Sequence, residues 1–169
     1  RQDYGLDRPF LVQLGWYIGG VLQFDLGYSF FFNEPVSKLI LQRLPATLLL
    51  VFSAQILALL VGVVLGIYSA RKPNGILSHF VTFFALFGYS APVFWTGILL
   101  LIAFSLNIPL FPVAGMRDVT IDGGFWVQTL DIAHHLVLPM VTLASIFLAL
   151  YSRLARATMV WCMVGTAVY

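Results

Sequence analysis

Long uncharged apolar segments alternate with short charged ones along this chain. Residues 46–70 carry no charged side chain and are followed at once by Arg71 and Lys72. At about 1.5 Å per residue this segment makes a helix of about 37 Å, longer than the roughly 30 Å hydrocarbon core of a bilayer. We therefore predict a first membrane-spanning helix over residues 46–70. Pro45 is predicted to occupy its first turn, where the missing N–H has no partner to lose.

Two further spans are predicted after the first. Residues 76–106 form a second uncharged segment, which Pro92 interrupts near its middle, and a third helix is predicted over residues 135–153. Residues 1–45 and 107–134 are richer in Gly and aromatic residues or in Gly and Pro, as expected of interfacial elements and a turn-rich outer loop. The predicted fold is all-α: a polytopic transmembrane helical bundle of about three spanning helices plus interfacial extracytoplasmic elements.

The composition supports a membrane protein and argues against other classes. Hydrophobic residues make up 60% of the 169 residues and charged residues only 9%, which is too little charge to cover a surface that faces water. The lipid bilayer is therefore a predicted partner. The basic residues form no patch, so the sequence gives no support for nucleic-acid binding. Two domains are predicted, an interfacial segment over residues 1–45 and a transmembrane region over residues 46–169.

The charge distribution predicts the orientation. All seven acidic residues lie within residues 1–45 and 107–134, whereas the other two polar segments carry cations only. These cations are Arg71, Lys72, Arg153 and Arg156. Because cytoplasmic loops are enriched in Lys and Arg, residues 71–75 and 154–169 are predicted to be cytoplasmic and the mixed segments to lie outside. The four cations are predicted cytoplasmic anchors of a multi-pass protein of the cell membrane.

Small residues recur every four positions in the first predicted span. They are Ala54, Ala58, Gly62 and Gly66, and Ala70 continues the series. Helices in lipid associate by close packing, so a stripe of small residues predicts a helix-packing face. Chance spacing in a span rich in Ala and Gly is the alternative interpretation.

Pro92 is the feature of the second predicted span that points most directly to function. Proline removes a backbone hydrogen bond and bends the helix, here near the middle of the predicted bilayer. Polar or half-polar groups surround it at this depth and should face other helices or a water-filled path. The candidate residues of a substrate path are Tyr89, Ser90, Pro92, Trp95 and Thr96. A purely structural bend, satisfied by Ser90, is the alternative.

Other chemistry finds little support in the sequence. Neither lysine lies in a Gly-Lys-Ser/Thr phosphate loop, so ATP hydrolysis by that route is excluded. Possible metal ligands occur at Asp131, His134 and His135, but the sequence lacks a wider set of ligands around them. Interfacial anchoring is therefore the favoured interpretation of these residues. No carboxylate lies in any predicted span, so we predict no catalytic residues, no metal site and no cofactor.

Six short segments resemble one family of membrane proteins. They occur in that family's order, at similar intervals, over nearly the whole chain. The segments are GLDRP (residues 5–9), DLGYS (25–29), RLPATL (43–48), GYSAPVFW (88–95), LFPVAG (110–115) and HLVLP (135–139). Together they resemble the permease subunit of bacterial and archaeal ABC importers of the dipeptide, oligopeptide and nickel group.

The resemblance implies a type I importer. Its expected partners are a second permease subunit, identical or homologous, cytoplasmic ATP-binding subunits that hydrolyse ATP, and an extracytoplasmic substrate-binding protein. The implied substrates are di- and oligopeptides, with nickel or another small solute as the alternative within the family. The chain is expected to be truncated at both ends, lacking an earlier helix and the segment that couples to the ATPase. A non-transporting membrane scaffold or a nonfunctional permease fragment is the alternative from another class.

Overall fold

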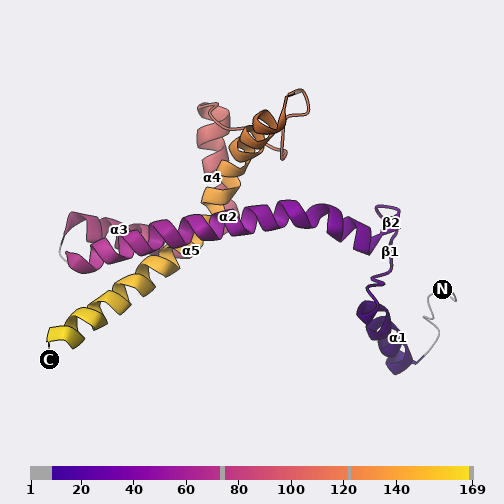
Figure 1. The fold of residues 1–169 in the computed structure, drawn as a ribbon, viewed down its shortest axis with the longest axis horizontal. Coiled ribbons are helices and arrows are strands. Elements are labelled where there is room, and N and C mark those ends of the chain that lie inside the picture. The colour runs from indigo at the N-terminus through magenta and orange to yellow at the C-terminus, as the bar shows by residue number, and fades with distance from the viewer. Residues whose placement is uncertain (1–8, 73–74, 122, 168–169) are drawn as a thin grey trace. The chain divides into compact units, whose positions relative to one another are not determined.

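A computed structural model describes residues 9–72, 75–121 and 123–167, with side chains described outside residues 77, 84–89 and 163–167. The chain divides into two compact units, Arg1–Thr47 and Leu48–Tyr169, which are described separately (Figure 1). Helices make up most of the described residues of both units, as predicted for an all-α fold. The exception among these residues is one hairpin, whose two strands have two residues each.

The first unit contains a short apolar helix and a hairpin. Helix α1 (Phe10–Leu22) follows Pro9, and strands β1 (Tyr28–Ser29) and β2 (Glu34–Pro35) pair antiparallel. The approach to β1 uses Gly27 at a φ of +79°, a left-handed conformation that suits glycine. The Asp25 carboxylate accepts a hydrogen bond of 3.1 Å from the N–H of Gly27 and stabilises this turn.

Helix α2 (Val36–Arg71) follows the hairpin directly. It begins ten residues before the predicted span, so the placement of Pro45 in the first helical turn is wrong, and Pro45 lies inside the helix. The helix continues through it at the cost of the one hydrogen bond that an N–H there would give to the Leu41 carbonyl. An ion pair of 2.7 Å between Lys38 and Glu34 supports the beginning of the helix.

The second predicted span consists of more than one helix. Helix α3 (Ile76–Ser90) ends before Pro92, and helix α4 (Val93–Leu101) begins after it and continues into the π-helical segment η2 (Ile102–Asn107). The sequence predicted a bend at this proline. The structure has a complete interruption, because Pro92 adopts an extended conformation with φ −60° and ψ 133°.

Helix α5 (Phe125–Ala167) covers the third predicted span and extends beyond it at both ends. Helix therefore occupies residues 125–134, which the sequence analysis assigned to the outer loop, and the described residues of the connection before it, 108–121 and 123–124, are irregular. Pro139 lies inside α5 without ending it. Helix α5 packs against α3 with one part and against α4 with another, and Figure 1 shows α4 and the start of α5 side by side.

A close helix contact in the second unit joins α2 to α5. Ala54 and Ala58 on α2 are 0% exposed and form a buried cluster with Ala144 on α5. A Cβ added to Gly62 would lie 2.9 Å from the Cβ of Tyr151, and one added to Gly66 would lie 2.6 Å from the Cβ of Ala155. Only residues without a side chain permit this approach, which is how small residues bring helix backbones together.

The contacts also give the relative direction of α2 and α5. A step of four residues on α2, from Gly62 to Gly66, matches a step from Tyr151 to Ala155 on α5. The two helices therefore run in the same direction. The charge pattern requires this of the first and third predicted spans, and the side of the membrane on which each helix ends stays a prediction.

The buried polar side chains described in this unit have hydrogen-bond partners within the protein. The hydroxyls of Ser69 on α2 and Ser78 on α3, both buried, lie 2.9 Å apart and join the two helices beside the turn between them. Gln55 Nε2 donates a hydrogen bond to the Tyr151 hydroxyl and adds a polar contact to the α2–α5 seam. No buried side-chain nitrogen or oxygen among the described residues lacks a hydrogen-bond partner. Such satisfaction is required where water is absent.

Two described helices are long and apolar enough to cross a membrane, Val36–Arg71 and Phe125–Cys162. Helix α3, with 15 residues, reaches only about 22 Å, less than the roughly 30 Å of a hydrocarbon core. Apolar residues 93–107 continue the chain beyond Pro92. How α3 and this segment share a membrane crossing stays a prediction.

Replacing Gly66 tests whether the α2–α5 contact stabilises the fold. Gly66→Val places side-chain atoms against Ala155 and Ser152, so we expect a loss of about 1–3 kcal/mol, as for other overpacked sites. The matched control is Val64→Phe, which enlarges an exposed side chain on another face of the same helix. Thermal unfolding in detergent measures both, and an equal effect of the two substitutions would contradict the contact.

Candidate functional site

The interruption at Pro92 leaves a short stretch of non-helical backbone between two apolar helices. The Pro92 carbonyl accepts hydrogen bonds from the N–H groups of Trp95, at 3.0 Å, and Thr96, at 3.2 Å, and so begins α4. The Thr96 hydroxyl also points back to this carbonyl, at 3.5 Å. Ser90 and Ala91 therefore form the joint between α3 and α4, where the backbone can change direction without breaking either helix.

A pocket of about 380 Å³ lies beside this joint. It is lined by Ser90, Ala91, Pro92, Phe94 and Trp95. Three residues of the predicted substrate path, Ser90, Pro92 and Trp95, thus share one concave surface, with the Ser90 side chain exposed. Thr96 does not line the pocket, and the side chain of Tyr89 lies outside the described residues.

A second pocket of about 410 Å³ lies on another side of α4. Helices α2, α4 and α5 and the connection after η2 all contribute to its wall, and Phe94 lines both pockets. Its polar side chains are His135 and Thr142, and the Thr142 hydroxyl donates to the Leu138 carbonyl at 2.7 Å. The sequence analysis did not predict this pocket, because its residues come from distant parts of the chain.

A close contact between Gly97 and Thr142 holds α4 against α5 beside this second pocket. A Cβ on Gly97 would lie 3.2 Å from the Thr142 methyl group, so a larger residue would force the helices to adjust. A glycine in the middle of an apolar helix was the available sequence signal for this contact.

The connection over residues 108–124 is fastened to the start of α5 by a polar network. Asp131 accepts a hydrogen bond of 2.7 Å from the N–H of Asp118, and its other oxygen lies 3.2 Å from His135 Nδ1. The side chains of Asp131 and His135 are only 10% and 9% exposed. His134 Nε2 lies 2.7 Å from the Leu110 carbonyl and therefore donates to it. Asp131 and His134 thus act as a latch on this loop, and His135 supports Asp131 from the next turn of the same helix, since its Nδ1 also lies 2.9 Å from the Asp131 carbonyl.

The latch accounts for the residues that the sequence analysis considered as metal ligands. Two adjacent histidines on a helix point in different directions, and here each ring meets a separate partner. The described residues contain no group of three or more His, Cys, Asp or Glu side chains placed to hold a metal ion. The geometry supports a role of these side chains in attaching the loop to α5. Interfacial anchoring, the interpretation favoured from the sequence, does not by itself describe that role.

Asp118 adds a local turn to the same loop. Its carboxylate accepts hydrogen bonds from the hydroxyl of Thr120, at 2.7 Å, and from the N–H of Thr120, at 2.9 Å. These bonds favour the charged form and lower the pKa of Asp118 below its ordinary value. The turn is therefore strongest at a pH above the ordinary pKa of an aspartate, and it weakens as the pH falls through the lowered pKa of Asp118.

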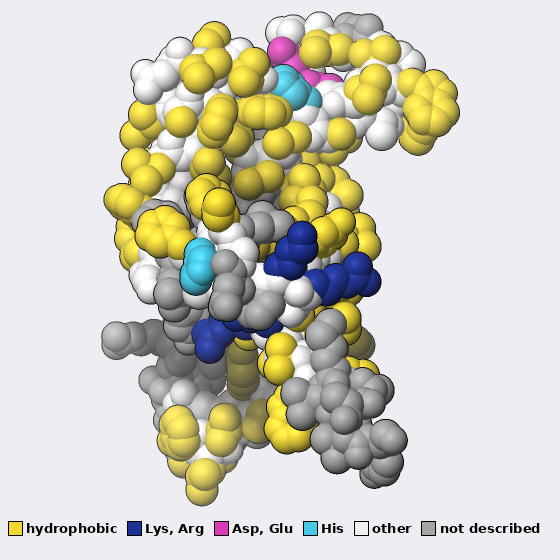
Figure 2. Space-filling model, turned by 90° about the vertical axis from the view of Figure 1, so that its left-hand side faces the viewer, with side chains coloured by type: hydrophobic (Ala, Val, Ile, Leu, Met, Phe, Trp, Pro, Cys, Tyr) yellow, Lys and Arg dark blue, Asp and Glu magenta, His cyan; other side chains and the backbone are white. Residues whose placement is uncertain are grey.

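The four predicted anchors lie at one end of the second unit. Arg71 and Lys72 close α2, and Arg153 and Arg156 lie on the turn of α5 against which Gly66 packs. Figure 2 looks onto this end and shows Lys and Arg side chains gathered among hydrophobic ones. Arg71, Lys72 and Arg153 are exposed, whereas Arg156 is partly buried and donates to the Thr82 hydroxyl at 3.2 Å. That these residues face the cytoplasm stays a prediction.

Comparisons with known proteins match most of this unit. The family model described as "binding-protein-dependent transport system inner membrane component" matches residues 62–160. The oligopeptide transport system permease protein AppB of Bacillus subtilis is 35% identical over 94% of this chain and 49% of its own length. The dipeptide transport system permease protein DppB of Escherichia coli is 34% identical over 93% of this chain and 51% of its own length.

A third relative extends the same pattern. The probable D,D-dipeptide transport system permease protein DdpB of Escherichia coli is 35% identical over 94% of this chain and 51% of its own length. The chain thus spans about half the length of the curated relatives that it matches. Residues 62–160 include the joint at Pro92, the pocket beside it, the basic end, and every lining residue of the second pocket except Leu50.

Removing the Asp131 carboxylate tests the latch. Asp131→Ala leaves the Asp118 N–H without its partner, so we expect amide exchange at residues 118–120 to rise about tenfold, the effect of a lost hydrogen bond worth about 1–3 kcal/mol. His135 keeps its contact of 2.9 Å with the backbone carbonyl of residue 131. The control is Thr129→Ala on the same helix, whose hydroxyl bonds only to the Phe125 carbonyl. Unchanged exchange in the Asp131 variant would rule out the latch.

Proposed function

The chain belongs to the family of binding-protein-dependent transport system inner membrane components, and on that premise we propose that it forms part of the translocation path of an ATP-driven importer of di- and oligopeptides. The observation that carries the proposal is the family match over residues 62–160 together with relatives that are named as peptide transport permeases. The nickel alternative is less favoured, because the relatives compared are named for oligopeptides, dipeptides or D,D-dipeptides.

The geometry around Pro92 supports a place for this chain in the path itself. Transporters commonly place substrate near interrupted helices, where irregular backbone lines a cavity. Here the joint between α3 and α4 borders one pocket, and Phe94 lines that pocket and the second one. The exposed hydroxyl of Ser90 and the indole of Trp95 offer a polar group and an aromatic face to a passing peptide.

Alternating access is the mechanism that this arrangement fits. The α2–α5 seam is closely packed and supplies a rigid frame, whereas the α3–α4 joint is the natural place for a change of direction. Rotation of α4 at the joint would enlarge the pocket on one of its sides at the expense of the other. A small change at Ser90 and Ala91 would then shift the opening of the path from one side of the membrane to the other.

The proposed machine needs partners besides this chain. The path would be completed by a second permease subunit, identical or homologous. Energy would come from cytoplasmic ATP-binding subunits, and an extracytoplasmic binding protein would deliver the peptide, as the family description implies. The basic end of the unit, with Arg153 and Arg156, would face the cytoplasm in this arrangement.

Uptake measurements test the substrate class. Cells that carry the operon encoding this chain should accumulate a labelled dipeptide, and deletion of this chain should abolish the accumulation. Accumulation of labelled nickel in the same cells serves as the parallel measurement. Nickel uptake without dipeptide uptake would overturn the peptide assignment, and retention of both activities after deletion would overturn the transport assignment.

Pro92→Ala tests the role of the interrupted helix. Alanine restores the backbone N–H and allows α3 and α4 to join, so we expect dipeptide uptake to fall about tenfold or more while the subunit still assembles with its partners. Co-purification with the ATP-binding subunit measures assembly. The control is Pro109→Ala, an exposed proline of the connection after η2 that interrupts no helix and lines neither pocket beside α4. An equal loss of uptake and of assembly in Pro92→Ala would favour a purely structural bend.

A further inference from the structure

The third pocket of the second unit lies at its basic end, away from the joint at Pro92. It has a volume of about 490 Å³ and lies between α3 and α5. Its wall consists of Val81, Thr82, Ser152, Arg153, Arg156, Ala157, Val160 and Trp161. The volume is in the range of about 300–1,000 Å³ that is typical of small-molecule sites. The transport path proposed above uses none of these residues.

Two arginines give this pocket a positive charge that the described part of the protein leaves uncompensated. Arg153 and Arg156 lie three residues apart on α5, so their side chains leave adjacent turns on neighbouring faces. The ion pairs of the described residues join Lys38 to Glu34 and His135 to Asp131, and neither involves these two arginines. An anion is therefore the ligand that the charge favours.

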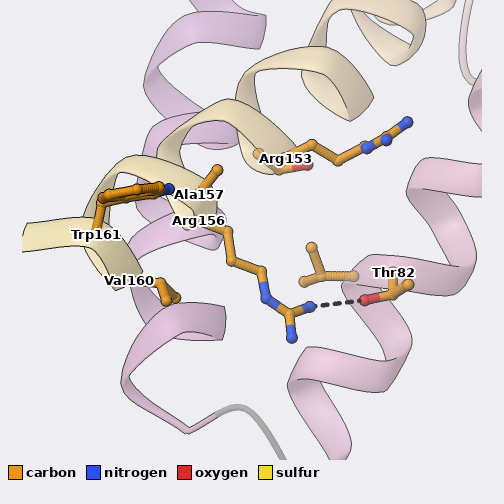
Figure 3. A pocket seen from close by; sticks show the side chains of 8 residues that line it. Thr82, Arg153, Arg156, Ala157, Val160 and Trp161 are labelled. Atoms are coloured by element: carbon orange, nitrogen blue, oxygen red, sulfur yellow. Dashed lines mark hydrogen bonds between the residues drawn. The ribbon is translucent and has the colours of Figure 1, made fainter. Parts of the chain in front are cut away.

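The guanidinium of Arg156 is partly positioned already. It reaches from α5 across the pocket to α3, where Nη1 donates to the Thr82 hydroxyl at 3.2 Å (Figure 3). The Thr82 hydroxyl donates in turn to the Ser78 carbonyl at 2.8 Å. The remaining donors of the planar fork stay available, and their geometry matches two oxygens of a phosphate.

The rest of the wall suits hydrocarbon. Val81, Ala157 and Val160 are apolar, and Trp161 lies at the edge of the pocket with 81% of its surface exposed (Figure 3). Tryptophan is enriched where a membrane protein meets the headgroup region. Cations beside an apolar wall at the end of apolar helices are the combination that binds lipid headgroups between transmembrane helices.

We propose that the α3–α5 pocket binds the phosphate of an anionic phospholipid, with Arg156 and Arg153 on the phosphate and the apolar wall against the start of an acyl chain. A soluble phosphate would offer the two arginines the same anionic group as the lipid headgroup. The apolar wall of the pocket favours the lipid over the soluble anion. The site would fasten α3, the helix before the joint, to α5 and to the surrounding leaflet. This proposal depends on the membrane location of the family and not on the transported substrate.

Native mass spectrometry of the purified full chain tests the proposal. Phosphatidylglycerol and phosphatidylcholine with identical acyl chains are the probes, and we expect about a tenfold preference for phosphatidylglycerol. The double variant Arg153→Gln/Arg156→Gln should lose this preference of about tenfold. The matched control Arg71→Gln/Lys72→Gln removes two cations at the same end but outside the pocket, and it should keep the preference.

Four results would overturn the proposal, and the last of them concerns a companion variant. The first is equal retention of the two lipids by the unchanged protein, and the second is an equal loss of preference in the control double variant. The third is displacement of phosphatidylglycerol by glycerol phosphate at equal concentration, which would assign the site to a soluble anion. Ala157→Trp, which fills the pocket and leaves both arginines in place, is the companion variant. It should lose the preference with unchanged helicity, and full retention in it would also contradict the proposal.

Discussion

The close approach of α2 and α5 is the constraint on which the rest of the second unit depends. Apolar side chains gain little by leaving lipid for protein, so helices in a membrane are held by contact at short range. Ala54, Ala58, Gly62 and Gly66 make that contact possible by presenting almost no side chain to α5. The paired helices form a frame, and the less regular elements are attached to this frame at separate points.

Each attachment uses a different interaction. Helix α3 is joined to α2 by the buried serine pair and to α5 through Thr82 and Arg156. Helix α4 lies against α5 where Gly97 meets Thr142, and the connection after η2 is fastened by Asp131. The joint at Pro92 lies between the attachments of α3 and α4. A unit with a rigid frame and one interrupted helix can change the position of α4 while its core contacts remain, which is what a transport path requires.

The sequence predicted those features that depend on local pattern. The length of the uncharged apolar segments predicted the long helices. The spacing of small residues, four positions apart, predicted the face of α2 that packs on α5. Helix ends were predicted poorly: α2 continues through Pro45, and α5 begins ten residues before its predicted start. The second pocket, the Asp131 latch and the arrangement around Arg156 join residues far apart in the chain. No local pattern encodes such pairings. The sequence drew attention to Asp131 and Arg156 by their residue types, but it did not identify their partners.

Disulfide cross-linking in membranes tests the α2–α5 frame most directly. Ala58→Cys and Ala144→Cys, in a Cys162→Ser background, place two thiols in one buried cluster, and the account predicts rapid and nearly complete oxidation to an intramolecular disulfide. Pairing Ala58→Cys with Leu150→Cys, which lies on an exposed face of α5, should give little product. Equal yields from the two pairs, or none from the first, would contradict the frame and with it the arrangement of every element attached to it.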